Sequence, residues 1–445
     1  MISEEIDWAK VKDEATELLS RYIQVNTINP PGNEIQGALF LKALLDEEGI
    51  QSDILESEKG RGNLIAKMKG TGDKPSLLLL HHIDVVPVEE KKWHHPPLSG
   101  KVVNGEIWGR GALDCKSLGI MELLTFLLLK RTGFQPKGDI ILAATADEEA
   151  GGAYGVSWLL EKHPHLLDAK YVINESGGIG FNIPGNHLYF CQTAEKGVCW
   201  FRISFQGESG HASLPHGTNC VSEMSKAITR IAEAQLPFNV TSVSERFIRN
   251  IAEEQPFIPP SDFIDLLNPQ HFADTIVKIS DPSLQVILPA MFYNTIVPTV
   301  VLGGKKTNVI PSECYCELDV RLLPGETPED MVTFITNLLN GINDFHLEAL
   351  GTSSSSESSI ESDLFSCFEK SLKKQDHKAK LIPCMSSGAS DSRFFRELGA
   401  IAYGVQAETS FEALSSVHSH NEKISTSTLL FGTRVLYDTV RMFAG

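Results

Sequence analysis

The 445-residue sequence lacks the features that mark secreted or membrane-spanning proteins. Residues 1–7 contain neither a basic nor an apolar stretch, so we expect no signal peptide. The longest apolar runs, such as the leucines at 77–80, are far too short to span a bilayer. The eight cysteines form no CxxC pair, and Cys314 and Cys316, two apart on one strand face, are poorly placed to bridge. Reduced thiols in a cytoplasmic protein are therefore expected.

Positive charge is also scarce. The 39 lysines and arginines face 57 aspartates and glutamates, which gives a formal net charge of -18. This balance argues against nucleic acid and anionic membranes as partners, because both require a basic surface. It leaves room for a small anionic substrate in a local arginine pocket. The hydrophobic share of 42% and the charged share of 22% are those of a globular protein, and the length suits two domains.

Strands and helices alternate in the first part of the chain, which predicts an α/β sandwich. The predicted strands 76–81 and 139–146 contain unbroken apolar stretches, as expected for strands buried on both faces. The predicted helices are 8–22, 36–48, 117–131 and 155–162, and the other predicted strands are 52–55, 63–67 and 171–174.

The pattern changes near residue 195, where half-exposed strands begin. Strands at 199–205, 299–302 and 314–322 and helices at 221–234 and 328–340 approach a β-α-β-β-α-β unit. Residues 236–298 are expected to form an irregular insertion, and the Ser-rich stretch 351–359 a flexible return linker. We therefore predict a catalytic domain made of residues 1–194 and 351–445, with a second domain, 195–350, inserted into it.

Imidazole and carboxylate groups follow several of the predicted strands. His82 and Asp84 lie two apart in an extended segment, so Asp84 could hold one ring nitrogen of His82 while the other binds a metal. Asp114 could bridge two cations, although on local evidence alone it would cap the helix that follows. These groups suit zinc in a hydrolytic site.

Three adjacent acids, Asp147, Glu148 and Glu149, follow a buried strand and need a compensating charge, which a metal could supply. Neighbouring carboxylates diverge, so one could bind metal while the other acts as a general base. A solvated acidic loop is the alternative. Glu175 follows another strand, and His418 precedes an Asn-Glu pair near the C-terminus.

The ordered set of motifs resembles the dinuclear-zinc metallopeptidase family that includes aminoacylase, glutamate carboxypeptidase, acetylornithine deacetylase and succinyl-diaminopimelate desuccinylase. The resemblance covers nearly the whole chain. The motifs are His-x-Asp-x-Val-Pro at 82–87, Trp-Gly-Arg-Gly-Ala-Leu-Asp-Cys-Lys at 108–116, Asp-Glu-Glu at 147–149, Gly-His-Ala-Ser-Leu-Pro at 210–215, Asn-Val-Ile-Pro at 308–311, Asp-Val-Arg at 319–321, Gly-Ala-Ser-Asp-Ser-Arg-Phe-Phe at 388–395 and His-Ser-His-Asn-Glu at 418–422.

The resemblance implies a fold and a role for each matching residue. The fold is an α/β zinc-peptidase catalytic domain, a mixed sheet between helices, with an inserted α+β ferredoxin-like lid or dimerisation domain. Two zinc ions, or cobalt or manganese, are held by five residues, of which Asp114 bridges both ions: His82, Asp114 and Glu175 for one ion, and Asp114, Glu149 and His418 for the other. His420 could compete, but the His-x-x-Asn-Glu spacing selects His418.

The remaining implied roles concern catalysis and substrate. Glu148 takes a proton from the metal-activated water, Asp84 orients His82, and His211 stabilises the oxyanion, in the partner's site in dimeric relatives. The substrate-binding residues are Arg321, Asn308 and Arg393, and the guanidinium groups of the two arginines suit a carboxylate. A cis peptide is implied after Asp114.

We therefore predict a hydrolase of N-acyl amino acids or C-terminal peptide bonds, which could form a homodimer through the inserted domain. Glu175, where relatives have Asp or Glu, tilts the substrate towards N-acyl amino acids. One alternative is an aminopeptidase or dipeptidase of the same family, and the other is a catalytically inactive binding protein.

Overall fold

The computed structural model describes residues 6–177, 182–183, 186–215, 217, 219–405 and 416–445. The chain divides into two compact units. Unit 1 comprises Met1–Thr193, Ser358–Cys384 and Ser390–Gly445, and unit 2 comprises Ala194–Glu357 and Met385–Ala389. None of the described helices combines the length and the apolar content needed to cross a membrane.

A mixed sheet forms the centre of unit 1. Its strands β6, β3, β7 and β18 run parallel to one another, whereas β1 and β2 on one side and β9 on the other pair antiparallel with their neighbours. The spatial order is β1 (Ser52–Glu56), β2 (Gly62–Met68), β6 (Ile140–Thr145), β3 (Leu77–His82), β7 (Tyr171–Asn174), β18 (Ile401–Val405) and β9 (Asn186–Glu195). Two further strands, β8 (Asn182–Ile183) and β17 (Ala379–Ser386), also pair with β9.

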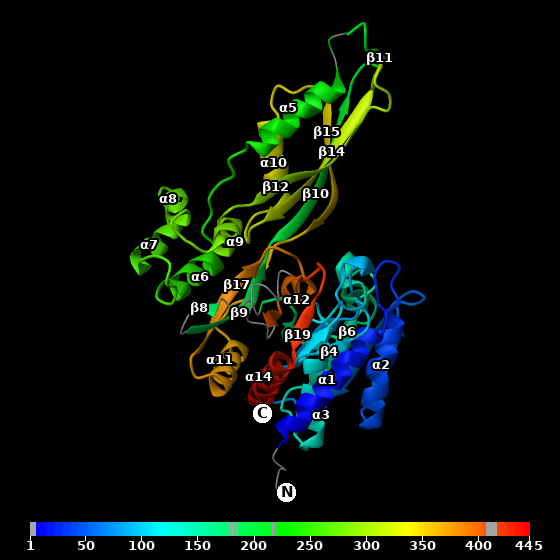
Figure 1. Ribbon diagram of the computed structural model, residues 1–445, viewed down its shortest axis with the longest axis vertical. Coiled ribbons are helices and arrows are strands. Elements are labelled where there is room, and N and C mark those ends of the chain that lie inside the picture. Colours follow the sequence, from blue (N-terminus) through cyan, green and yellow to red (C-terminus); the bar gives the residue numbers. More distant parts are fainter. Residues whose placement is uncertain (1–5, 178–181, 184–185, 216, 218, 406–415) are drawn as a thin grey trace. The chain divides into compact units, whose positions relative to one another are not determined.

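Helices cover both faces of this sheet. On one face pack α1 (Trp8–Gln24), α2 (Glu34–Glu47), α3 (Lys116–Arg131), α11 (Asp363–Gln375) and α14 (Thr426–Ala444), and on the other α4 (Val156–Lys162) and α12 (Ser392–Glu397). In Figure 1, α1, α3 and α14 lie side by side. Leu77 and Leu79 face the first layer, whereas Leu78 and Leu80 face the second. The alternation confirms that this strand is buried on both faces, as its unbroken apolar run predicted.

Unit 2 contains a four-stranded antiparallel sheet of order β12 (Thr295–Gly303), β14 (Glu313–Leu322), β10 (Gly197–Gln206) and β15 (Phe345–Ser353). Helices α5 (Cys220–Ala232) and α10 (Pro328–Leu338) pack on one of its faces (Figure 1). Along the chain, these elements follow β-α-β-β-α-β, and the strand order is that of a ferredoxin-like sheet. The predicted fold class is confirmed.

The insertion at 236–298 is not irregular as predicted. It contains α6 (Ser242–Ala252), α7 (Pro260–Ile264), a 3-10 turn (Asp265–Leu267), α8 (Phe272–Ile276) and α9 (Pro282–Phe292), and from Thr295 it already belongs to β12. Helix α6 begins with a capping box between Thr241 and Ser244 and buries Phe247 and Ile251. The two ends of the segment meet in an aromatic cluster, in which the rings of Phe238 and Phe292 stack with their centroids 5.0 Å apart. The helices of this segment are short, and the loops between them contain proline but no glycine. The sequence therefore shows little helical periodicity here.

The prediction of a flexible Ser-rich linker is also wrong. Strand β15 continues to Ser353, paired with Val198, and β16 (Ser356–Glu357) pairs with the end of β9. The backbone N–H of Ser358 donates to Thr193 O at 2.8 Å. Because the neighbouring strands satisfy the backbone here, serine content does not prevent strand formation. The chain accordingly returns to unit 1 at Ser358 rather than at residue 351.

Candidate metal centre

The predicted ligands meet at one edge of the unit 1 sheet. His82 ends β3, Glu149 lies in the 3-10 turn Glu148–Ala150 after β6, and Glu175 follows β7. These three strands are parallel neighbours, so their carboxyl ends lie together. Asp114 precedes α3, and His418 precedes the short strand β19 (Lys423–Ser425).

Asp114 stands between the two histidines. Its Oδ1 lies 2.9 Å from Nε2 of His82, and its Oδ2 lies 3.1 Å from Nε2 of His418. Glu175 Oε2 lies 3.5 Å from the same nitrogen of His82, and Glu149 Oε2 lies 3.0 Å from that of His418. The potential ligand atoms form two groups, and within each group all atoms lie within 4.8 Å of one another. Both groups contain the carboxylate of Asp114. The structure brings the five predicted ligands together.

The tautomer of His82 follows from its contacts. Nδ1 lies 2.9 Å from the backbone carbonyl oxygen of Asp84, which can only accept, so Nδ1 carries the proton. In the neutral ring, Nε2 then presents its lone pair to Asp114 and Glu175, as a metal ligand must. The Asp84 carboxylate is more distant, with Oδ1 3.5 Å from Nδ1, and accepts hydrogen bonds from the backbone N–H groups of Glu148 and Glu149 instead.

The charges of the site fit divalent cations. The hydrogen bonds that His418 donates to the carboxylates of Asp114 and Glu149 raise the pKa of His418 to about 10, and burial raises the pKa of Glu175 to about 7. Protons are held here because three carboxylates converge in a buried place, and a metal ion would displace them. Cys115 Sγ is also near His82, but burial raises the pKa of this thiol well above its usual range, so it stays protonated. Oxygen and imidazole donors without thiolate suit two zinc ions, and also manganese or cobalt.

His420 lies outside the ligand groups. Its Nε2 is 3.7 Å from Oε1 of Glu89.

The peptide bond between Asp114 and Cys115 is cis, as the family resemblance implied. Four of the six described non-glycine residues with positive φ lie in the site segments: Asp147, Ser176, His418 and Asn421. Such backbone conformations cost free energy and are concentrated at active sites, where the surrounding structure holds them in place.

Sequence reasoning assigned no role to Glu422, which fastens two site segments together. This carboxylate is fully buried and accepts hydrogen bonds from Arg110 Nη1 at 2.7 Å and from the N–H groups of Gly111, Leu113 and Asp114. Arg110 also donates to Ser419 O at 2.7 Å. The loop that carries His418 is thereby tied to the turn that carries Asp114. A glutamate inside the His-x-x-Asn-Glu motif was the available signal.

The positive charge that compensates Asp147 comes from an arginine side chain, and not from a metal ion as the sequence suggested. Asp147 forms a buried ion pair with Arg61. Of the three adjacent acids, only Glu149 belongs to a ligand group. Burial, followed by the charge of Glu175, raises the pKa of Glu148 well above its usual range. A carboxylate of this kind is suited to accept and return a proton.

Two of the other predicted site residues lie together in unit 2. The short strands β11 (Gly210–His211) and β13 (Val309–Ile310) pair, and Ala212 N donates to Asn308 O at 3.1 Å. His211 and Asn308 are therefore neighbours. Arg321 lies near the C-terminal end of β14, where it is paired with Val198 of β10. Its guanidinium forms a two-pronged ion pair with Asp319, at 2.7 and 2.9 Å.

Arg393 is held by its own unit. Only 7% of the residue is exposed, and its guanidinium donates to Ser390 O at 2.8 Å and Gly151 O at 2.9 Å. It also lies over the ring of Phe394, 4.3 Å from the centroid. A role in binding a substrate carboxylate stays a prediction for this residue.

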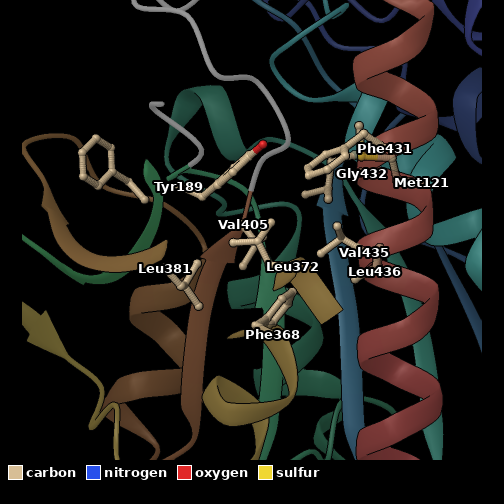
Figure 2. Close-up of a pocket in the computed structure, with 12 residues that line it drawn as sticks. Met121, Tyr189, Phe368, Leu372, Leu381, Val405, Phe431, Gly432, Val435 and Leu436 are labelled. Carbon is tan, nitrogen blue, oxygen red and sulfur yellow. The ribbon is translucent and has the colours of Figure 1, made fainter. Parts of the chain in front are cut away.

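An apolar cavity lies elsewhere in unit 1, among helix α14, the strand residue Tyr189 and Val405 (Figure 2). Its volume is about 30 Å³, which is room for about two water molecules. The lining residues are Leu118, Met121, Tyr189, Phe190, Phe368, Leu372, Leu381, Val405, Phe431, Gly432, Val435 and Leu436. The cavity is too small for a substrate and contains none of the predicted site residues.

Two curated proteins are similar to this chain in sequence. The chain is 27% identical over 392 residues to human N-fatty-acyl-amino acid synthase/hydrolase PM20D1, covering 83% of this chain and 75% of that protein. It is 28% identical over 333 residues to the probable succinyl-diaminopimelate desuccinylase of Staphylococcus aureus strain Mu50, covering 74% of each.

The fold matches a solved M20 family metallo-carboxypeptidase, Sso-CP2 from Sulfolobus solfataricus. The TM-score is 0.74 at 20% identity, covering 97% of this chain and 99% of that one. The model of peptidase family M20/M25/M40 matches residues 78–442, which include all five predicted ligands. The resemblance predicted from the motifs is confirmed, and the chain belongs to peptidase family M20/M25/M40.

Proposed function

We propose that this hydrolase of the M20 peptidase family cleaves the amide bond of N-acyl amino acids, or the C-terminal bond of small peptides, with two zinc ions. His82, Asp114 and Glu175 would hold one ion, and Asp114, Glu149 and His418 the other. The observation that carries the proposal is the placement of Asp114 between two imidazole nitrogens, at 2.9 and 3.1 Å, each with its own second carboxylate. Two relatives named for N-acyl amino acid substrates support the substrate class.

The bound zinc ions supply Lewis acidity, which polarises a carbonyl and lowers the pKa of water towards neutrality. Glu148 would accept a proton from the attacking water and return it to the leaving amine. Its high pKa and its position beside the ligand Glu149 suit both transfers. Asp84 orients the backbone of Glu148, to which its Oδ1 is bonded at 3.1 Å. The backbone carbonyl of Asp84 accepts a hydrogen bond from Nδ1 of His82 and so leaves Nε2 of this histidine free to bind a metal ion.

The remaining residues act on the substrate. His211 donates to the oxyanion that forms at the scissile carbonyl, and Asn308, its neighbour, contacts the same part of the substrate. Arg321 binds the free carboxylate of the amino acid. Asp319 takes two of the five guanidinium donors and fixes the plane of the group, so another edge remains for a second carboxylate.

The first experiment assays zinc-reconstituted enzyme on a matched panel of N-acyl amino acids and dipeptides, each with the amine or the carboxylate blocked. We expect hydrolysis that requires the free carboxylate but not the free amine. Hydrolysis that requires the free amine would make the chain an aminopeptidase or dipeptidase. The Glu148→Gln variant is the control, because it should retain both metal ions and lose turnover.

We infer in addition a cytoplasmic homodimer formed through unit 2, in which His211 and Asn308 of one subunit serve the other subunit's metal centre. Light scattering measures the mass. Glu148→Gln should be inactive alone and His211→Ala strongly impaired. Mixing the two variants should raise activity above that of either one, since one of the two sites in the mixed dimer is then complete. No recovery after subunit exchange would contradict the shared site.

A further inference from the structure

A buried arginine and a buried asparagine, both outside the metal motifs, adjoin the acidic turn of residues 147–149. Arg61 precedes β2 and is 6% exposed, and Asn29 follows α1 and is 6% exposed. The guanidinium of Arg61 contacts Glu34 Oε1 at 3.1 Å, donates to Asn29 Oδ1 at 3.2 Å and to Pro31 O at 3.0 Å, and pairs with Asp147. This buried cation therefore has three hydrogen-bond acceptors, Asn29, Pro31 and Asp147, and a second carboxylate, that of Glu34, in ion-pair contact, which distinguishes it from a surface ion pair.

Asn29 links this cation to two carboxylates. Its Nδ2 donates to Asp84 Oδ2 at 2.8 Å and to Asp147 Oδ1 at 3.0 Å, and its Oδ1 accepts from Arg61. The orientation of the amide is determined, since guanidinium can only donate and ionised carboxylates can only accept. The hydrogen-bonded path therefore runs from Arg61 through Asn29 to Asp84.

Asp84 carries the path to the backbone of the site. Its two oxygens accept the N–H groups of Glu148 at 3.1 Å and Glu149 at 3.2 Å. Asp147, at the start of the turn, has a φ of 70° and is held from the other side by the N–H of Tyr154 at 3.1 Å. The ring of Tyr154 in turn lies 5.0 Å from the Arg61 guanidinium. The turn is thus anchored at each of its three residues.

We propose that Arg61 and Asn29 are positioning residues that hold this turn so that Glu149 faces Asp114 and His418 while the adjacent Glu148 diverges from it. The proposal rests on the function proposed above. Without the cation, the carboxylates of Glu34, Asp84 and Asp147 would repel one another in a buried place, and a turn with a left-handed residue would relax. Relaxation moves Glu149 away from His418, and one metal ion is bound less well.

The test titrates metal-free Arg61→Lys and Asn29→Ala with Zn²⁺ by calorimetry. Lysine keeps the charge but loses the planar fork, and alanine breaks the path to Asp84 without leaving an unpaired charge. We expect one of two binding events to weaken about 10- to 100-fold and kcat to fall by a similar factor, with KM within about two-fold. The matched control is Arg131→Lys, which loses a fork to Glu14 and Glu48 on the surface of the same unit and should bind both ions normally.

Unchanged binding of both ions and unchanged kcat in Asn29→Ala would overturn the proposal. A lower melting temperature of Arg61→Lys with both ions bound normally would also overturn it, because the role would then be structural only. Should Arg61→Lys fail to fold, Asn29→Ala decides alone. The titration is independent of substrate: weakened binding in the variants of an enzyme that hydrolyses no tested amide would keep this proposal and overturn the proposed function.

Discussion

The Oγ of Ser213 lies 2.7 Å from Nδ1 of His211, and the backbone N–H of Ser213 donates to the same nitrogen at 3.2 Å. An N–H group can only donate, so Nδ1 accepts and the proton of the neutral imidazole is on Nε2. The side chain of His211 is thereby prepared to donate a hydrogen bond through Nε2. This is the form that an oxyanion requires.

The tautomer and the catalytic effect can be measured separately. In ¹⁵N-labelled enzyme, the His211 ring should show a protonated Nε2 and an unprotonated Nδ1. His211→Ala should lower kcat about 10²- to 10³-fold with little change in KM, since the contact forms only as charge develops. Ser213→Ala should cost only a few-fold, because the backbone donor remains, and Ser213→Thr should restore the loss. A proton found on Nδ1 would contradict the assignment.

The two histidines of the C-terminal motif should respond differently to replacement. His418→Ala removes an imidazole 3.0 Å from Glu149 and 3.1 Å from Asp114, so one metal ion should be lost and turnover with it. His420→Ala is the matched control. That ring faces Glu89, and the variant should keep two ions and an activity within about two-fold of wild type. Metal content by elemental analysis and kcat decide, and loss of metal in His420→Ala instead would reverse the assignment of the ligand.

Removal of the metal should lower thermal stability. A chelator leaves Asp114, Glu149 and Glu175 to repel one another around two imidazoles, whereas a ligand that binds only the folded state adds about 4 kcal/mol at a thousand-fold excess over its Kd. We expect the melting temperature to fall on chelation and to recover with Zn²⁺ but not with Mg²⁺, which prefers oxygen ligands. Equal melting temperatures with and without zinc would contradict a preformed metal centre.

Arg321 should control affinity for the substrate carboxylate. Arg321→Ala should raise KM about 10- to 100-fold for substrates with a free carboxylate and leave slow hydrolysis of carboxyl-blocked analogues unchanged. Asp319→Asn keeps the shape of the partner but loses its charge and should raise KM less, because Arg321 becomes less well oriented. An equal effect on free and blocked substrates would show that Arg321 serves only the fold of unit 2.

The sequence predicted the parts of the site that follow from local pattern. Unbroken apolar runs identified the buried strands and placed candidate ligands just past their ends, whereas the choice of the five ligands among these candidates came from the resemblance to the metallopeptidase family. Arg61 and Asn29 could not be found, because they lie 86 and 118 positions from Asp147 and no periodicity marks them. The same holds for Ser353, whose place in a strand depends on its pairing with Val198 and not on its own β propensity.

Stability should also depend on pH through Lys196, a buried lysine of unit 2. It is 1% exposed and donates to Tyr293 O at 2.7 Å, and burial, followed by the charge of Arg321, lowers its pKa to about 8. The unfolded chain keeps a value near 10.5. Between these values the unfolded state binds more protons than the folded one, so the free energy of unfolding contributed by this group rises with pH.

The expected gain between pH 8 and pH 10.5 is at most about 3 kcal/mol, since each pKa unit corresponds to about 1.4 kcal/mol. Lys196→Met removes the titrating group and should flatten the pH dependence. Lys226→Met replaces an exposed lysine of α5, whose side chain is 61% exposed, and should follow the wild-type curve. Urea unfolding at several pH values in this window gives the three curves. Parallel curves for wild type and Lys196→Met would mean that Lys196 stays charged in the folded protein, with Tyr293 O and further polar groups compensating its burial.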